Sequence, residues 1–318
     1  MTILESILLG VIQGIFMFFP VSSTSHLVLT QHWLSQRGSA LPPAESPEMI
    51  FFDLIVHVGT LISIAVVFRQ SLSRFIIKVW QDTIQFLTTL TTSRREPLSL
   101  SLLGKEIRPL ILPSGERGDN RYLYLRLAIL GMLSVVVTAL IGFPMRSLFK
   151  AVFAQPLAIA LTLTITGILL WYTDYKRHQK VGLREMNPLV ASIIGVGQAL
   201  SLMPGLSRSG MTISFSLFAG MKRQWAAEYS FFIAFPTILG ATLLQVIEVI
   251  EADAWDNIGF LPMFIGFVVS AIVGIFALYL VVILLYKAKF RFFSFYVWAL
   301  AVIVAIGSFR GVFSTDFG

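Results

Sequence analysis

The chain has 318 residues, of which 56% are hydrophobic and 13% charged, and it contains no cysteine. Soluble domains carry about 25% charged residues, so the composition excludes an ordinary soluble domain, and the lack of cysteine excludes disulfides and cysteine-ligated metal sites. The formal net charge is +7, but the basic residues flank apolar segments, so we expect no nucleic-acid partner.

Long apolar segments predict an all-α integral membrane protein. Ile258–Tyr286 and Phe292–Phe309 contain no charged residue, and about 20 apolar residues in a helix span the hydrocarbon core of a bilayer. A soluble core helix of this length would carry a polar stripe. The six predicted transmembrane helices are Met49–Phe68, Leu123–Phe143, Leu157–Tyr172, Ala226–Ile250, Gly259–Tyr286 and Phe292–Phe309.

Two further apolar segments contain a break and are predicted to be re-entrant helical hairpins. Thr2–Leu34 and Pro188–Gly220 are each interrupted midway by proline and small polar residues. If either crossed the membrane completely, the basic loops would fall on alternating sides. Broken backbone at membrane depth is tolerated only where protein or a water-filled cavity surrounds it, so each segment is expected to enter, break and return.

The distribution of basic residues predicts the orientation. Basic loops follow the first and third spans, precede the fourth and separate the last two, whereas the loop at Glu251–Asp256 has no Lys or Arg. The positive-inside rule places the basic loops in the cytoplasm and both termini outside. The short loop with Arg146 and Lys150 is the one outside connection that departs from this rule.

The two breaks resemble each other, which predicts an internal repeat. Because the predicted hairpins enter from opposite sides, the repeat has inverted topology and its breaks meet near the midplane. One polytopic domain is expected over residues 1–318, with repeat halves of about 1–172 and 186–311. Val79–Thr92 is expected to be an interfacial helix, and residues 93–120 a polar cytoplasmic insertion. At one constant offset, Pro20 aligns with Pro204, Ser23 with Ser207 and Ser25 with Ser209.

The breaks have the chemistry of a phosphate site. A helix that restarts after Pro-x-x-Ser presents free N–H groups and the positive end of its dipole to an anion. Arg208, in the first turn of the second restart, would grip two phosphate oxygens, unless it snorkels to the interface. Ser23 and His26 share one helix face and would form a nucleophile–base pair, or else the serine caps the helix and the histidine bonds a carbonyl.

Other polar residues in the apolar segments favour structural roles. His57 lies one turn from Asp53 and is expected to make an internal hydrogen bond. Glu228 falls in the first turn of its span, where the helix dipole favours an anion. No cluster in the sequence has convincing metal-ligand spacing.

Two motifs match a known family. Residues Pro204–Thr212 fit the pattern P-G-x-S-R-S-G-x-T, and Phe19–His26 is close to F/L-P-V-S-S-T-G-H, with Ser25 where glycine is usual. Both patterns belong to the undecaprenyl-pyrophosphate phosphatases, the bacterial membrane proteins tied to bacitracin resistance, which this chain resembles from Ile3 to about Phe309. The resemblance does not cover residues 93–120.

The resemblance implies hydrolysis of a C55 polyprenyl diphosphate to the monophosphate and inorganic phosphate, which recycles the carrier lipid of peptidoglycan (cell-wall) synthesis. It implies a multi-pass protein of the bacterial cytoplasmic (inner) membrane whose active site faces the periplasm. It also implies a divalent cation, Mg²⁺ or Ca²⁺, with no organic cofactor, and contacts with membrane lipids. The oligomeric state does not follow from the sequence. The implied catalytic residues are Ser23, His26 and Arg208, and the implied substrate-binding residues are Gln13, Ser22, Thr24, Ser207, Ser209 and Thr212.

One departure from the family pattern bears on catalysis. The family has E/Q-x-x-x-E before the first proline, and here Gln13 fills the first place but Met17 the second. A carboxylate at position 17 could hold a cation or act as a general base. A thioether cannot act as a general base, and it does not bind a hard cation such as Mg²⁺ or Ca²⁺. The metal ligands are therefore unknown. A non-catalytic or weakly catalytic lipid-diphosphate binder or transporter is the alternative, and a phosphatase for another lipid phosphate is a third hypothesis.

The predicted orientation is tested by cysteine labelling, because the chain has no cysteine of its own. Asp253→Cys should react with an impermeant thiol reagent in intact cells, whereas Ser114→Cys should not. Labelling of the Ser114 variant alone would reverse the orientation.

Overall fold

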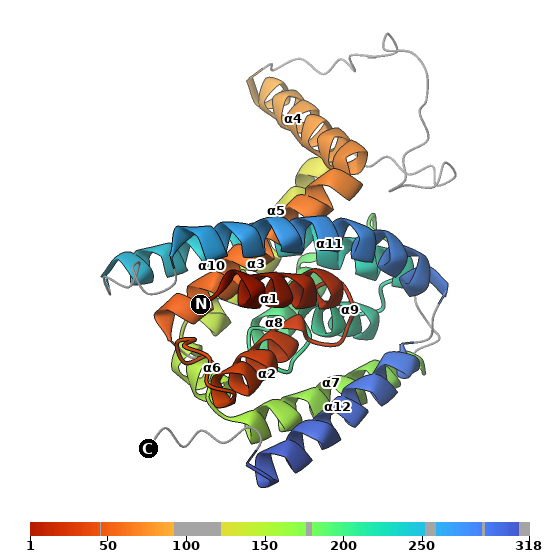
Figure 1. Ribbon diagram of the computed structural model, residues 1–318. Helices are drawn as coiled ribbons and strands as arrows, with labels where there is room; N and C mark the ends of the chain where they lie inside the picture. The colour runs from red at the N-terminus through yellow and green to blue at the C-terminus, as the bar shows by residue number, and fades with distance from the viewer. Residues whose placement is uncertain (45, 92–121, 176–179, 252–258, 288–289, 312–318) are drawn as a thin grey trace.

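The computed structural model describes residues 1–44, 46–91, 122–175, 180–251, 259–287 and 290–311 (Figure 1). Regular structure in these ranges is helical, apart from one isolated bridge between Val181 and Met221. The helices are α1 (Ile3–Phe16), α2 (Ser23–Gln36), α3 (Pro47–Val67), α4 (Arg69–Thr91), α5 (Leu123–Gly142), α6 (Arg146–Phe153), α7 (Pro156–Thr173), α8 (Pro188–Leu200), α9 (Arg208–Phe218), α10 (Arg223–Glu251), α11 (Phe260–Lys287) and α12 (Arg291–Phe309).

The six predicted spans are confirmed. Within the described ranges, α3, α5, α7, α10, α11 and α12 are long and apolar enough to cross a bilayer. Large apolar side chains also point out of the bundle, with Leu140 70% and Phe276 72% exposed, as expected of surfaces that face lipid. α10 begins at Arg223 rather than Ala226, because the helix includes a polar first turn that hydropathy alone does not detect.

The predicted interfacial helix was too short. α4 begins at Arg69 rather than Val79 and extends away from the bundle in Figure 1. Its first ten residues mix basic and apolar side chains, so hydropathy suggested a loop, yet backbone hydrogen bonding continues through them. The Asp82 carboxylate accepts the N–H groups of Tyr124 at 2.8 Å and Leu125 at 3.1 Å, which ties α4 to the start of α5. The predicted insertion at 93–120 lies outside the described residues.

Both predicted breaks are present. α1 ends at Phe16 and α2 begins at Ser23, while α8 ends at Leu200 and α9 begins at Arg208. In each case the two helices pack against each other. Each break contains a residue with positive φ, which is Ser22 (65°) in the first and Gly205 (93°) in the second. The chain thus reverses at both of the Pro-x-x-Ser sequences.

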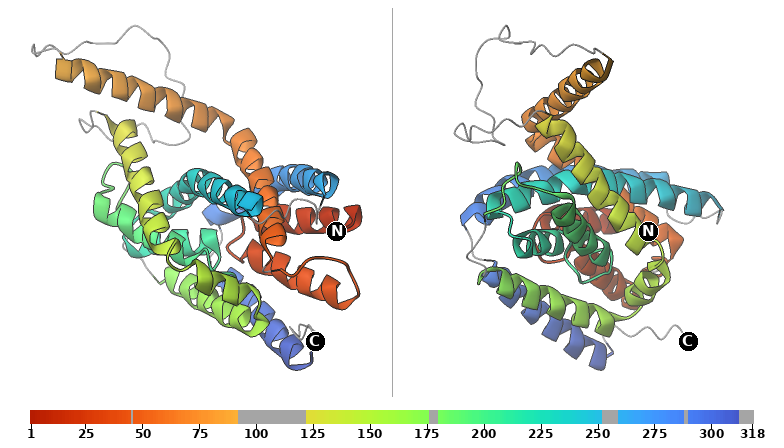
Figure 2. Two further views of the ribbon diagram at one scale, coloured as in Figure 1. Left: turned by 90° about the vertical axis from the view of Figure 1, so that its left-hand side faces the viewer. Right: turned by 180° about the vertical axis from the view of Figure 1, so that it is seen from behind.

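The broken helix pair of each half of the chain packs against a long helix of the other half. α1 packs on α11 of the second half, and α8 packs on α5 of the first half. α3 contacts α10, and α7 pairs with α12, which lie side by side in both views of Figure 2. Each half of the chain therefore packs against helices of the other half. The repeat halves of about 1–172 and 186–311 stay a prediction. The broken helices lie between α10 and α11 on one side and α7 and α12 on the other (Figure 1).

Candidate active site

The two breaks contact each other directly. The backbone N–H of Gly205 donates to Ser22 Oγ at 3.2 Å, and Ser209 Oγ donates to the carbonyl of Phe19 at 3.2 Å. Residues that lie far apart in the sequence therefore form one polar cluster, as the repeat predicted. Each break supplies hydrogen-bond partners to the other, which unwound backbone requires inside a membrane protein.

α7 supports the second break from behind. Thr162 Oγ1 donates to the carbonyl of Pro204 at 2.6 Å, and Thr166 Oγ1 donates to that of Gly205 at 2.7 Å. A Cβ at position 205 would clash with the Thr162 hydroxyl, so glycine is required there both for its positive φ and for this close approach. Neither threonine belongs to a sequence motif, because hydropathy treats both as ordinary positions in a span.

Arg208 reaches across to the first break. Its Nη2 donates to the thioether sulfur of Met17 at 3.0 Å, and Gln13 Nε2 donates to the same sulfur at 3.2 Å. No ion pair joins Arg208 to an acidic side chain among the residues that the structure describes. Its charge is therefore not balanced by a neighbouring carboxylate. Gln13 Oε1 is buried and has no hydrogen-bond partner in the described part of the chain.

The hydroxyls around Arg208 mostly hold the start of α9. Ser207 Oγ caps the helix by accepting the N–H of Gly210 at 3.2 Å. Thr212 Oγ1 shares a 2.5 Å hydrogen bond with Ser230 Oγ of α10. Ser207, Ser209 and Thr212 thus lie around the start of α9, and each hydroxyl has a hydrogen-bond partner within the protein.

The start of α2 is strained and uncapped. Ser22 adopts φ 65° and ψ 84°, and no side chain caps the helix. A non-glycine residue in this region costs on the order of 1–3 kcal/mol. The first N–H groups of α2, which include those of Ser23 and Thr24, therefore donate no hydrogen bond to the Ser22 side chain. Free N–H groups at a helix N-terminus form an anion site.

His26 does not hydrogen-bond to Ser23. Its Nδ1 lies 2.7 Å from the carbonyl oxygen of Ser22, and its Nε2 lies 2.9 Å from the hydroxyl of Tyr296 on α12. A carbonyl only accepts, so Nδ1 carries the proton and Nε2 accepts from the tyrosine. The Phe16 ring stacks on the imidazole with centroids 4.0 Å apart. No sequence motif marked Tyr296, which lies in an otherwise apolar span.

A second buried polar pair joins α2 to α3. Gln31 Nε2 donates to the Asp53 carboxylate at 2.8 Å. His57 Nδ1 donates to the backbone carbonyl of Asp53 at 2.6 Å, which confirms the predicted internal hydrogen bond. These contacts hold the helix that carries Ser23 and His26.

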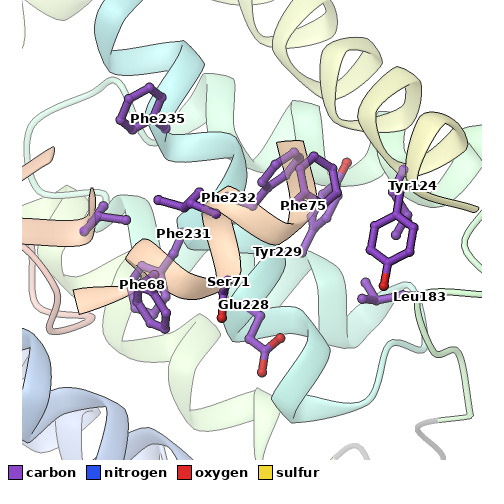
Figure 3. Close-up of a pocket in the computed structure, with 13 residues that line it drawn as sticks. Phe68, Ser71, Phe75, Tyr124, Leu183, Glu228, Tyr229, Phe231, Phe232 and Phe235 are labelled. Carbon is purple, nitrogen blue, oxygen red and sulfur yellow. The ribbon is translucent and has the colours of Figure 1, made fainter. Parts of the chain in front are cut away.

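Glu228 lies in the lining of an aromatic cavity (Figure 3). The cavity is lined in part by α10, the helix whose Ser230 bonds Thr212. Gln224 Nε2 donates to its Oε1 at 3.5 Å. The sequence placed Glu228 in the first turn of its span, and this was wrong, because α10 begins three residues earlier at Arg223 and has no acidic residue in its first turn.

The residues around Arg208 do not fit the divalent cation that the resemblance implies. Mg²⁺ and Ca²⁺ prefer carboxylate and other hard oxygen ligands. Position 17 instead offers a thioether. The positive charge of the neighbouring Arg208 guanidinium would repel a metal cation there. Within the described ranges, no group of three or more acidic or histidine side chains is placed to hold a metal.

Comparison with known proteins agrees with this arrangement of motifs. The family model described as Bacitracin resistance protein BacA matches residues 6–303. The chain belongs to this family. Among its relatives, the protein named undecaprenyl-diphosphatase from Alkalilimnicola ehrlichii is 54% identical over 300 residues, which cover 94% of both chains. The protein of that name from Halorhodospira halophila is 48% identical over 95% of this chain and 96% of its own.

More distant family members match the whole chain as well. The protein named undecaprenyl-diphosphatase from Carboxydothermus hydrogenoformans is 30% identical over 97% of this chain and 98% of its own. This coverage includes both breaks and the spans that hold them.

Replacing Arg208 by lysine tests its bidentate role. Arg208→Lys keeps the charge but loses the planar fork, so transition-state stabilisation should fall by on the order of 2–4 kcal/mol, as in oxyanion-hole deletions. The measurement is kcat/KM for phosphate release from polyprenyl diphosphate. Arg310→Lys, at an exposed position, is the matched control. Normal turnover in a folded Arg208→Lys protein would rule the fork out.

A double-mutant cycle tests Ser23 and His26. If both act on one attacking oxygen, Ser23→Ala with His26→Ala should be little slower than the slower single variant. Phosphate release by each purified variant gives the cycle, and circular dichroism checks folding. Strictly additive losses would show that the two residues work independently.

Proposed function

We propose that the protein is an undecaprenyl-diphosphatase, which hydrolyses a C55 polyprenyl diphosphate to the monophosphate and inorganic phosphate. The observation that carries the proposal is the position of Arg208. It lies at the N-terminus of α9, reaches the first break, and has no acidic partner among the described residues. Relatives of that name over more than nine-tenths of the chain support the same activity.

The diphosphate binds between the two breaks. Arg208 and the free N–H groups at the start of α2 contact the phosphate oxygens, with Ser22, Thr24, Ser207, Ser209 and Thr212 around them. Charge that develops on the transferring phosphoryl group is stabilised by these fixed donors, which need no rearrangement at the moment of reaction. Gln13 Oε1, buried and available, accepts a hydrogen bond from a water or a protonated phosphate.

The attacking oxygen belongs to Ser23 or to a water, and His26 accepts its proton at Nε2. The Nδ1–H bond to the carbonyl of Ser22 fixes the tautomer, so Nε2 is the basic atom. Nε2 has one lone pair, which accepts from the Tyr296 hydroxyl, so the attacking oxygen takes the place of that hydroxyl when it gives its proton to Nε2. Attack on the terminal phosphorus breaks the anhydride P–O bond, and the polyprenyl monophosphate leaves. Attack by a water gives inorganic phosphate directly, whereas attack by Ser23 gives a phosphoserine that a water then hydrolyses to inorganic phosphate and free serine.

The location of the site follows from the predicted orientation. The first hairpin enters from the periplasm and the second from the cytoplasm, so the breaks meet within the membrane. The protein belongs to the bacterial inner membrane, and the diphosphate reaches the breaks from the periplasmic side. A lipid diphosphate supplies its own membrane anchor for this approach.

Phosphate release by purified protein tests the proposed function. Polyprenyl diphosphate should yield one inorganic phosphate per monophosphate formed, and Arg208→Ala should abolish release. Tight binding of the lipid diphosphate without hydrolysis would instead favour the non-catalytic binder that Met17 suggests.

Met17→Glu tests the missing carboxylate. The new carboxylate should pair with Arg208 and slow the reaction in EDTA, yet raise Mg²⁺-dependent phosphate release by about 10-fold. The native protein should respond weakly to the same cation. If Glu228→Gln abolishes release while Met17→Glu has no effect, Glu228 has taken over the carboxylate's role.

A further inference from the structure

The outer side of α4 carries an exposed apolar stripe, which consists of Ile76, Ile77, Trp80 and Ile84. Trp80 is 67% and Ile84 45% exposed, and the other two side chains lie between these values. The four residues recur at intervals of three and four, so they share one side of the helix. Yet α4 is not among the helices of the described ranges that are long and apolar enough to cross a bilayer.

The opposite side of α4 is occupied by the bundle. Phe75 packs against Tyr124 with ring centroids 6.0 Å apart. The Phe86 ring packs edge-on against Tyr122 at 5.6 Å, and the Asp82 carboxylate accepts the N–H groups at the start of α5. The first residues of α4 also line the aromatic cavity, together with the end of α3 and the starts of α5 and α10. These contacts fix the orientation of α4 about its own axis and leave the stripe facing outward.

A polar face with two basic residues borders the stripe. Arg74, Lys78, Gln81 and Gln85 follow one another at helical spacing, and the last three are exposed. The helix contains three basic residues and one acidic residue, Asp82, whose carboxylate is engaged by the N–H groups of α5. The outer surface of α4 is therefore apolar on one side and positively charged on the next.

The position of α4 in the chain places this surface at one side of the membrane. α4 begins directly after α3 ends, and the basic loops predict that this end of α3 lies in the cytoplasm. In both views of Figure 2, α4 projects from the bundle. A stripe at this position meets the lipid of the cytoplasmic leaflet, and tryptophan is enriched at such a membrane–water interface.

We propose that α4 is a membrane-surface helix that binds anionic phospholipids of the cytoplasmic leaflet. The stripe enters the boundary between headgroups and acyl chains, and Arg74 and Lys78 contact the lipid phosphates. Amphipathic helices with a basic face bind membranes through buried apolar area and attraction to anionic headgroups. Half of the stripe and both basic residues precede Val79, where hydropathy placed the start of an interfacial helix. The surface is separate from the phosphate cluster, so the bound lipid does not have to be a substrate.

Paired labels on α4 test the location of the stripe, because the chain has no cysteine of its own. Ile84→Cys lies in the stripe, and Gln85→Cys, one residue on, lies on the polar face. Each variant carries an environment-sensitive fluorophore in vesicles of equimolar phosphatidylcholine and phosphatidylglycerol. Lipids with a quencher near the headgroup should quench the label at position 84 more than lipids with a quencher at the end of the acyl chain. A water-soluble quencher should reach mainly the label at position 85.

Removing one charge tests the preference for anionic lipid. In the Ile84→Cys protein, Lys78→Gln should raise about fivefold the mole fraction of quencher-bearing phosphatidylglycerol that gives half-maximal quenching. This fold-change corresponds to the usual contribution of one basic residue near an anionic membrane surface. The value for quencher-bearing phosphatidylcholine should not change. Arg310→Gln, which removes one exposed charge at the end of α12, is the matched control and should change neither value.

Equal access of the water-soluble quencher to the two labels would overturn the proposal. So would half-maximal quenching by phosphatidylglycerol that Lys78→Gln leaves unchanged. A disulfide between two unlabelled Ile84→Cys chains, with a label at position 84 shielded from lipid quenchers, would show that a second copy of this chain covers the stripe instead. All the substituted side chains are exposed, and circular dichroism checks that each variant is folded.

Discussion

Backbone groups released by a broken helix inside a membrane protein must find partners, and this constraint organises the molecule. In the break before α2, the Phe19 carbonyl accepts from Ser209, and in the break before α9 the backbone groups of Pro204 and Gly205 find partners in Ser22, Thr162 and Thr166. An unsatisfied group in an apolar surrounding costs several kcal/mol. The reactive cluster and the centre of the fold are therefore the same set of hydrogen bonds.

Arg208 is held by a weak and neutral partner. A thioether accepts hydrogen bonds poorly, so the contact between Arg208 and the Met17 sulfur contributes little energy, and the phosphate contact proposed for Arg208 would cost little to form. A carboxylate at that position would pair strongly with the Arg208 guanidinium and would repel a phosphate dianion. A cation between the carboxylate and the phosphate would then be needed to offset this repulsion. Met17 thus leaves the guanidinium charge of Arg208 without a carboxylate at position 17, which favours the direct anion binding that we propose.

α10 contributes side chains to two different surroundings. Ser230 joins the polar cluster, while Phe231 and Phe232 face the aromatic cavity. Adjacent residues of a single helix therefore belong to the polar cluster and to the aromatic cavity.

The sequence by itself determined the six spans, the two breaks and the residues at them, because apolar length and Pro-x-x-Ser punctuation are local properties. It placed α10 within three residues and missed the first turns of α4, where hydropathy is mixed. Only the tertiary structure decided the partners: Arg208 meets Met17 across 191 residues, and His26 meets Tyr296 across 270. Neither contact has a motif, since each depends on how separate helices pack. The aromatic cavity likewise exists only where four helix ends converge, and no single segment of sequence contains it.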